Sequence, residues 1–309
     1  MKTETLELFS EGTPLVGLLR TPEATASDPP WPVIVQPPGY LGLAGGPVSE
    51  MYHAKFTDAG FCVVSVDYRG FGASEGAKGW IHPARQLEDL VAVMDYVAGA
   101  DPRLDPARVF CYGHGGTGGG NAILLGAIDD RVRAVAAQTP VADGEQWLRR
   151  MRSEADWQAY LRRLKEDAVV CATDGVGELV NPREEIMVAT PERRREATRS
   201  YADDRIPDPF HLASASLIMR YRPVDWVKLI SPRPLLLISL SGDVVTPPDI
   251  GAEALYKAAG LPKRIVRQRG ELSHYDAYRV NLDVICEEIV SWFRGAASAV
   301  EPVFGEEQL

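Results

Sequence analysis

The segment from Arg108 to Ala122 limits the fold of this chain more than any other part of the sequence. A short apolar run from Val109 to Tyr112 has the length and composition of a buried strand, and it stops at Gly113. A cluster of glycines follows, and Asn121 to Ile128 then has the composition of a helix. Glycine accepts backbone conformations that larger residues avoid. The segment therefore predicts a strand, a sharp turn and a helix in direct succession.

Strands and helices alternate on both sides of this turn. At the N-terminal end, Thr5–Ser10 and Leu15–Arg20 predict an antiparallel hairpin at a sheet edge. The other predicted strands are 33–35, 61–66, 132–137, 234–239 and 264–267, and the other predicted helices are 48–59, 82–97, 249–259 and 281–293. Strands joined by helices in this order imply an α/β fold with a mostly parallel central sheet flanked by helices.

The alternation stops between Val141 and about Ile230, where the sequence shows no clear strand. Charged, aromatic-containing segments such as Gly144–Lys165 and Pro191–Tyr201 predict amphipathic helices. A helical insertion at the carboxyl edge of a parallel sheet is placed to cover an active site. We therefore expect a core domain of residues 1–140 and 231–309, with residues 141–230 as a helical lid.

Composition restricts the partners and the compartment. The 309 residues carry a formal net charge of -10, which disfavours nucleic acid as a partner. The N-terminus has no apolar signal core and no run reaches membrane-spanning length, so we expect a cytoplasmic protein with no membrane partner. A homodimer is compatible with the sequence. The four cysteines have no metal-ligand spacing and indicate reduced, mostly buried thiols: Cys62, Cys111, Cys171 and Cys286.

Several blocks, taken together with the alternation, resemble the α/β-hydrolase superfamily over nearly the whole chain. The blocks are Asp67–Ser74 after a strand, Pro140–Gly144 at the entry to the insertion, Gly242–Pro248, and Ser273–Tyr278. More narrowly, the chain is similar to the bacterial branch related to dienelactone hydrolases and acyl peptidases. That branch has a helical lid between the sixth and seventh strands.

The resemblance implies a catalytic acid at Asp243 and a catalytic histidine at His274, which complete a Ser-His-Asp triad in this superfamily. The acid orients the imidazole and stabilises its cationic form, so the pair makes a general base whether or not a serine is present. The serine is missing, however. Counted from the preceding strand, its place falls on Gly115, and counted back from Asp130 it falls on Gly116.

The remaining site residues follow from the same resemblance. The backbone N–H groups of Tyr40 and Gly116 are expected to form an oxyanion hole, because such donors need no side chain. The implied substrate is a small acyl, lactone or polyketide-like molecule, and no cofactor or metal is expected, because the sequence has neither a nucleotide-binding glycine pattern nor a histidine cluster. We expect four residues to contact the substrate: His114, Trp80, Trp147 and Asp143.

Three interpretations of the missing serine stay open. In the first, His274 and Asp243 act as a general base without a covalent intermediate, in an elimination, addition, cyclisation or water-mediated hydrolysis. In the second, the sequence is an inactivated Ser→Gly form of an ordinary serine hydrolase of esters, thioesters or lactones. In the third, the fold is a non-catalytic protein that binds a small molecule, although binding alone requires neither dyad residue.

Overall fold

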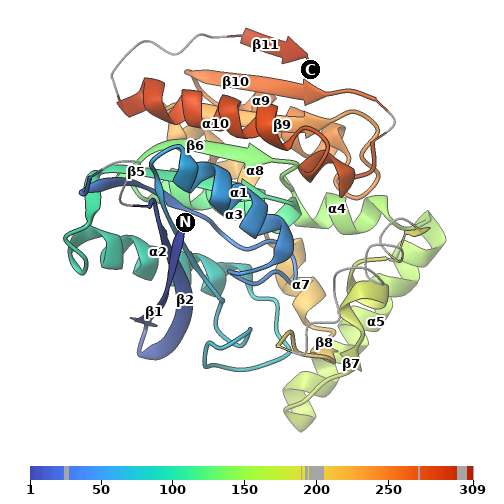
Figure 1. Ribbon diagram of the computed structural model, residues 1–309. Coiled ribbons are helices and arrows are strands. Elements are labelled where there is room, and N and C mark those ends of the chain that lie inside the picture. Colours follow the sequence, from blue (N-terminus) through green and yellow to red (C-terminus); the bar gives the residue numbers. More distant parts are fainter. Residues whose placement is uncertain are drawn as a thin grey trace.

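The computed structural model describes residues 1–23, 28–188, 190–191, 194, 205–270, 272–297 and 305–308. Within these residues, nine strands form one sheet in the order β1-β2-β4-β3-β5-β6-β9-β10-β11 (Figure 1). The sheet consists of β1 (Lys2–Ser10), β2 (Thr13–Thr21), β3 (Trp31–Val35), β4 (Cys62–Val66), β5 (Leu104–His114), β6 (Val132–Gln138), β9 (Leu235–Leu240), β10 (Lys263–Gln268) and β11 (Gly305–Gln308).

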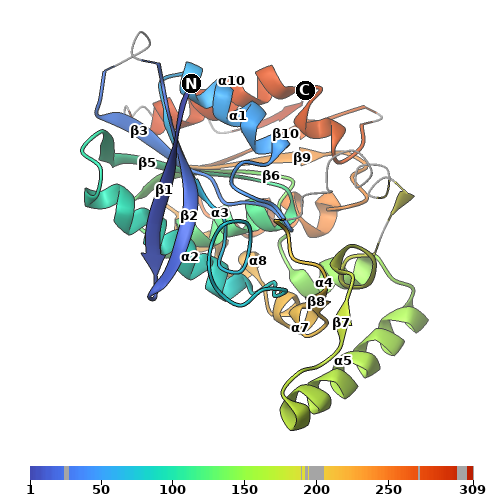
Figure 2. The same ribbon diagram turned by 60° about the horizontal axis from the view of Figure 1, so that its bottom comes forward.

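Most neighbouring strands in this sheet are parallel. Among the described strand pairs of this nine-stranded sheet, only β1–β2 and β2–β4 are antiparallel. The N-terminal hairpin lies at one edge of the sheet, as the sequence predicts, and β10 lies near the other (Figure 2). The sequence does not predict β11, which extends the sheet beyond β10.

Helices cover both faces of the sheet. One face carries α1 (Pro47–Asp58) and α10 (Leu282–Ala297). The other face carries α2 (Pro83–Gly99), α3 (Gly116–Ile128) and α9 (Ala252–Ala258). The helix expected over 249–259 is divided into a short 3-10 turn, Pro248–Ile250, and α9. This arrangement is an α/β-hydrolase type of fold, with a mostly parallel sheet between two layers of helices.

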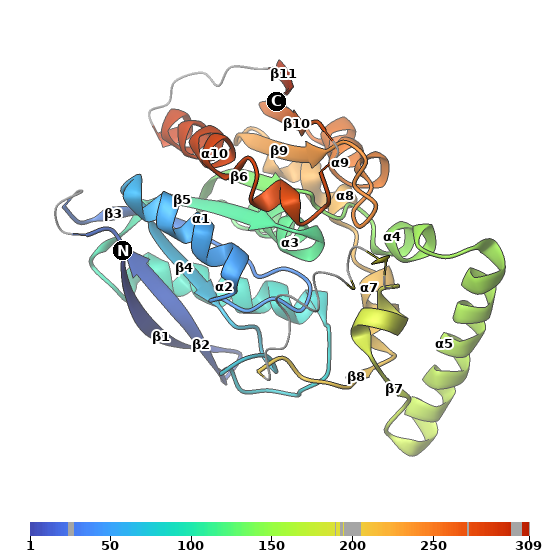
Figure 3. The same cartoon turned by 45° about the vertical axis from the view of Figure 1, so that its right-hand side comes forward.

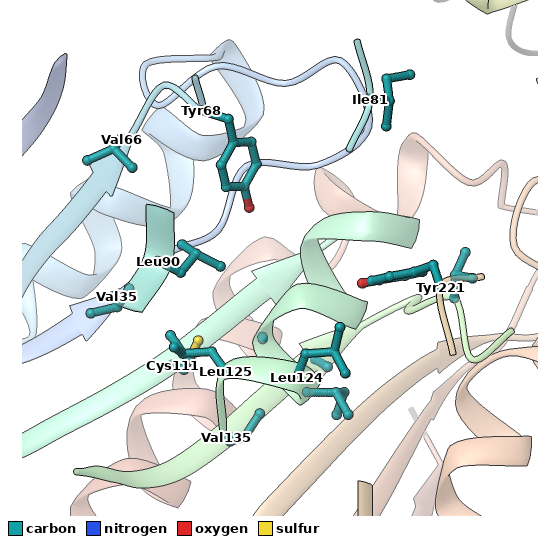
Figure 4. Packing of buried hydrophobic residues seen from close by; sticks show 14 of the residues in the cluster. Val35, Val66, Tyr68, Ile81, Leu90, Cys111, Leu124, Leu125, Val135 and Tyr221 are labelled. Atoms are coloured by element: carbon teal, nitrogen blue, oxygen red, sulfur yellow. The ribbon is translucent and has the colours of Figure 1, made fainter. Parts of the chain in front are cut away.

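The alternating strand residues explain why the core has two layers. Val35 of β3, Cys111 of β5 and Val135 of β6 point to the face where Leu90 of α2 and Leu125 of α3 pack (Figure 4). Their neighbours along each strand point to the opposite face and pack against α1 and α10. Because both faces are buried, these strands are apolar at nearly every position.

The segment between β6 and β9 contains two helices where the sequence predicts one over 144–165, together with elements that the sequence does not predict. Its helices are α4 (Gly144–Arg150), α5 (Glu154–Asp174), α7 (Ser214–Met219) and α8 (Pro223–Trp226), with a π turn, Pro182–Ile186, and a 3-10 turn, Val227–Ile230. Two short strands, β7 (Leu179–Val180) and β8 (Phe210–His211), pair antiparallel, which corrects the expectation of a segment without strands. Helix α5 extends away from the sheet (Figure 3).

Strands of two residues are too short to produce an alternating pattern, so the sequence does not predict β7 or β8. Most of the helix expected at 191–201 lies outside the described residues. In the part of the chain that is described, no helix is long and apolar enough to cross a membrane.

Candidate active site

The turn between β5 and α3 is centred on Gly115. Its backbone angles, φ 73° and ψ 166°, fall in a region that is nearly restricted to glycine. A Cβ atom built at this position would meet only the Tyr278 hydroxyl, at 3.7 Å, within 4 Å. Gly116 is already the first residue of α3. The structure therefore places the apex of the turn at Gly115, with room for a small side chain that the sequence does not supply.

The other glycines of this turn have a packing role. An added Cβ at Gly113 or Gly120 would collide with the Gly118 carbonyl oxygen or the Tyr221 hydroxyl, respectively. At Gly118 and Gly119 the same atom would approach Gly39 to 3.2 Å and Pro140 to 2.9 Å. The glycine cluster thus lets Gly39, Pro140 and the Tyr221 side chain approach the start of α3 closely.

His274 and Asp243 come from loops after adjacent parallel strands, β10 and β9, which brings them to the same edge of the sheet. Nδ1 of His274 lies 2.7 Å from Oδ2 of Asp243, and the two residues are 5% and 4% exposed. The Asp243 carboxylate also accepts hydrogen bonds from Val245 N at 2.8 Å, Thr246 N at 2.9 Å and Thr246 Oγ1 at 2.8 Å.

These contacts favour the ionised form of Asp243 and fix which ring nitrogen of His274 faces it as a donor. Burial raises the pKa of the Asp243 carboxyl, but the charge of His274 and the hydrogen bonds from His274 and Thr246 outweigh burial, and the net pKa shift is downward. An ionised Asp243 can only accept hydrogen bonds, so Nδ1 of His274 carries the proton. In the neutral imidazole, Nε2 then presents its lone pair on the other side of the ring.

Tyr278 lies on that side of the His274 ring. Its hydroxyl is 2.9 Å from Nε2 of His274 and 2.7 Å from Oγ1 of Thr139. The sequence patterns predict no role for Tyr278 or Thr246. Tyr278 ends the 3-10 turn Asp276–Tyr278, which begins two residues after His274, and the two side chains meet across this turn.

A cavity opens in front of the dyad. Of the residues expected at the site, Tyr40, His114, Gly115, Gly116, Trp147 and His274 line it. Its wall continues with residues after β3, in α1, in the segment between β6 and β9, and in the loops after β9 and β10: Gly39, Leu41, Gly42, Leu43, Gly46, Pro47, Val48, Ser49, Arg183, Glu184, Met187, Arg194, Val245, Thr246, Tyr275 and Tyr278.

Two aromatic residues of this wall, Tyr40 and Trp147, hold each other in place. The Tyr40 ring meets the Trp147 ring edge to face with a centroid distance of 5.9 Å. The Tyr40 hydroxyl donates to the Pro182 carbonyl at 2.8 Å, and Trp147 Nε1 donates to the Val245 carbonyl at 2.7 Å. These contacts tie the loop after β3 to the segment between β6 and β9.

His114, the last residue of β5, lies beside the apex of the turn. Its Nε2 is 3.2 Å from Ser49 Oγ, and its ring stacks on Tyr52 with a centroid distance of 5.7 Å. Burial lowers the pKa of His114 to about 4, with a smaller contribution from the charge of His274. His114 is therefore neutral near pH 7 and contributes a polar, uncharged group to the cavity.

The structure places Trp80 and Asp143 away from this cavity. Trp80 stacks on His211 with a centroid distance of 4.2 Å and lines a different cavity, near α2. Asp143 is the N-cap of α4, where it accepts from Gln146 N at 3.0 Å and pairs with Arg222. Neither position was apparent from the sequence, because each depends on the path of the segment between β6 and β9.

The chain belongs to the family described as X-Pro dipeptidyl-peptidase (S15 family), whose model matches residues 11–205, more than half of its length. It is 28% identical over 271 residues to an Escherichia coli protein called "Uncharacterized 31.7 kDa protein in traX-finO intergenic region", which covers 87% of this chain and 91% of that protein.

Solved structures agree on the fold. The hypothetical protein PA2218 from Pseudomonas aeruginosa is 22% identical, with a TM-score of 0.80, covering 96% of this chain and 94% of that one. The α/β hydrolase GrgF from Penicillium sp. sh18 is 18% identical, with a TM-score of 0.80, covering 96% and 100%. Family and fold together indicate a hydrolase-type α/β protein. Among the residues described, no group of three or more His, Cys, Asp or Glu side chains is placed to hold a metal ion.

Proposed function

We propose that this protein is an enzyme in which His274 and Asp243 act as a general base on a small acyl, lactone or polyketide-like molecule, with no covalent bond to the chain. One observation carries this proposal. A buried, hydrogen-bonded His-Asp pair faces a cavity in which a glycine, Gly115, stands where a nucleophile would be.

The proposed chemistry is a proton transfer. The neutral His274 accepts a proton from a bound water or from an acidic C–H of the substrate, and Asp243 stabilises the imidazolium that forms. The backbone N–H groups of Tyr40 and Gly116, two residues that line the cavity, are the proposed donors to the oxyanion that develops. Elimination, addition, cyclisation and water-mediated hydrolysis all begin in this way.

The segment of residues 141–230 is the proposed lid. Trp147, Arg183 and Met187 belong to it and line the cavity together with Leu41 and Leu43 of the loop after β3. The mixture of apolar side chains and a few polar groups suits a molecule with a carbonyl group on a largely apolar skeleton. This cavity is the basis for the proposed substrate class.

A second candidate function is serine hydrolysis by a form of this chain with serine at position 115. It is favoured because a Cβ atom at Gly115 would meet only the Tyr278 hydroxyl within 4 Å, at an ordinary contact distance of 3.7 Å. A pure binding protein is disfavoured, because a buried carboxylate is expensive to desolvate and binding does not need the dyad.

The experiment compares the wild-type protein with His274→Ala in two assays. The first measures hydrolysis of p-nitrophenyl esters and aryl lactones. The second follows, by NMR, the exchange of the α-protons of acyl thioesters with deuterated water. The variant is expected to lose about 10²- to 10⁴-fold in rate on the substrates that turn over. His82→Ala is a matched control, because His82 lies at the start of α2, away from the dyad. Equal rates for His274→Ala and wild type on every substrate would contradict the proposal.

A further inference from the structure

We propose that Tyr278 is a catalytic acid–base residue: its hydroxyl stands between His274 and the substrate and passes the proton from one to the other. This inference rests on the proposed function of His274 and adds the group that touches the substrate. Tyr278 lines the cavity, and its hydroxyl is 2.9 Å from Nε2 of His274. A Cβ at Gly115 would lie 3.7 Å from the same oxygen. The tyrosine hydroxyl therefore occupies the region between the base and the empty nucleophile position.

The direction of every hydrogen bond in this group follows from Asp243. The ionised carboxylate accepts from Nδ1–H of His274, so Nε2 of the neutral ring can only accept. The Tyr278 O–H must then donate to Nε2. The remaining bond, of 2.7 Å, is donated by the Thr139 hydroxyl to the tyrosine oxygen. The protons thus form one directed chain from Thr139 through Tyr278 and His274 to Asp243.

The backbone at Thr139 supports a functional reason for this chain. Thr139 has φ 48°, in the left-handed region that β-branched residues rarely adopt. Its N–H is held by the Ile238 carbonyl at 2.8 Å, next to the end of β6. Strained residues of this kind are concentrated at functional sites, where the surrounding structure supports the strain. Here the strained conformation carries the hydroxyl that donates to Tyr278.

The Tyr278 ring is also fixed from more than one side. It meets the His274 ring edge to face at 5.2 Å and an angle of 90°, and the His114 ring lies at 5.4 Å. The adjacent Ala277 carbonyl accepts from Gln138 Nε2 at 3.3 Å. A hydroxyl held this firmly is already in position when the substrate enters, which lowers the cost of reaching the reactive geometry.

The transfer conserves protons and needs no oxidant or other reactant. A water or a C–H of the substrate gives its proton to the tyrosine oxygen while the tyrosine O–H gives its proton to Nε2 of His274. The electron pair of the broken substrate bond remains as hydroxide or as an enolate. The imidazolium is stabilised by Asp243, and the reverse transfer returns the proton to the product. Burial keeps the pKa of Tyr278 well above its ordinary value, so the resting hydroxyl holds the proton that this sequence requires.

The test uses Tyr278→Phe in two backgrounds, the wild-type chain and Gly115→Ser. In the wild-type background, loss of the Tyr278 hydroxyl is expected to lower the rate on the substrates that the wild-type protein turns over by about 10- to 100-fold. In the Gly115→Ser background, the same change releases Nε2 for the new serine hydroxyl, so the burst of nitrophenolate from p-nitrophenyl acetate is expected to increase. Opposite signs in the two backgrounds are the predicted result. A change of the same sign in both, or no change, would overturn the role.

Two further variants keep the outcome clear. Tyr112→Phe removes a buried tyrosine hydroxyl that bonds Gln138 and is not part of the cavity wall, so it reports the structural cost of such a loss. Thr139→Val keeps the Tyr278 hydroxyl and removes the hydroxyl that donates to it. We expect the rate to fall about 3- to 10-fold, because one hydrogen bond is lost. If Tyr278→Phe does not fold, an unchanged rate in Thr139→Val overturns the proposal. If His274→Ala is inactive while Tyr278→Phe is fully active, only the role of Tyr278 fails, whereas an active His274→Ala contradicts the proposed function itself.

Discussion

The two halves of the site at the carboxyl edge of the sheet are built to different degrees. In the acid–base half, Asp243, Thr246, His274 and Tyr278 are connected by hydrogen bonds between side chains. In the half formed by the turn after β5, Gly115 keeps the unusual backbone of a nucleophile turn but offers no side chain. The proposed mechanism, proton transfer without a covalent nucleophile, requires this difference between the two halves.

The largest expected effect concerns the acid–base half. Asp243→Asn removes the carboxylate that keeps the proton on Nδ1 of His274 and stabilises the imidazolium. We expect the rate on aryl esters to fall about 10³- to 10⁴-fold while the fold is retained. Steady-state kinetics and circular dichroism check both parts. A loss of less than 10-fold would contradict the proposal that His274 and Asp243 act as the general base.

Alanine substitutions at two glycines of the turn should change the free energy of unfolding by different amounts. Gly113→Ala places a Cβ against the Gly118 carbonyl oxygen, and it is expected to lower the free energy of unfolding by about 3 kcal/mol or more. Gly115→Ala meets no atom closer than 3.7 Å and suffers only the backbone strain of its positive φ, about 1 to 2 kcal/mol. Urea unfolding of the two variants measures the difference. Equal losses would show that position 115 is as crowded as its neighbours.

The free energy of unfolding should depend on pH in the acid range because of His114, the buried neutral histidine beside the turn. The pKa of His114 is about 4 in the folded chain, against about 6.5 when unfolded. The unfolded state therefore binds more protons between these values, and the folded state loses stability as the pH falls from about 6.5 to 4, by about 3 kcal/mol in all.

His114→Gln keeps a polar group near Ser49 and removes this titration. The variant is expected to lose less stability than the wild type between pH 7 and pH 4.5 in urea unfolding. Burial lowers the pKa of His53 well below its ordinary value too, so part of the acid sensitivity should remain in the variant. Identical pH dependence in the variant and the wild type would contradict the assignment.

The smallest effect is expected at the hydroxyl that supports the acid. Thr246→Val removes the 2.8 Å hydrogen bond to Oδ2 of Asp243 but leaves the backbone N–H of Thr246 as a donor. A single such bond contributes about 1 kcal/mol, which corresponds to a loss of roughly 5-fold in rate. Kinetics on the same ester check this value. A loss as large as that of Asp243→Asn would give Thr246 a direct catalytic role.

Much of the fold could be predicted from local patterns in the sequence. The buried strands are short apolar runs, the helices α1, α2 and α10 have apolar residues at helical spacing, and glycines mark the turn after β5. These signals depend on residues close in the chain, so the sequence alone is enough to detect them. The family resemblance added Asp243 and His274, which lie 31 residues apart and meet only in the fold.

The rest depends on contacts between distant segments. Trp80 packs against His211, and Asp143 pairs with Arg222; neither pair has a local signal. The route of the chain between β6 and β9 decides which aromatic residues reach the cavity, and it brought Trp147 there but left Trp80 elsewhere. Tyr278 lies in the same sequence block as His274, but the contact of its hydroxyl with Nε2 of His274 exists only in the folded turn.

The most direct test of the central claim is a stopped-flow record of nitrophenolate release, with the wild-type protein concentrated enough for one equivalent of product to be visible and the p-nitrophenyl ester in large excess over it. Catalysis by a general base without a covalent intermediate predicts a linear steady state from the first turnover, with no burst, and a rate that collapses in His274→Ala. A burst of one nitrophenolate per protein molecule would show that an acyl-enzyme forms, and it would contradict the account.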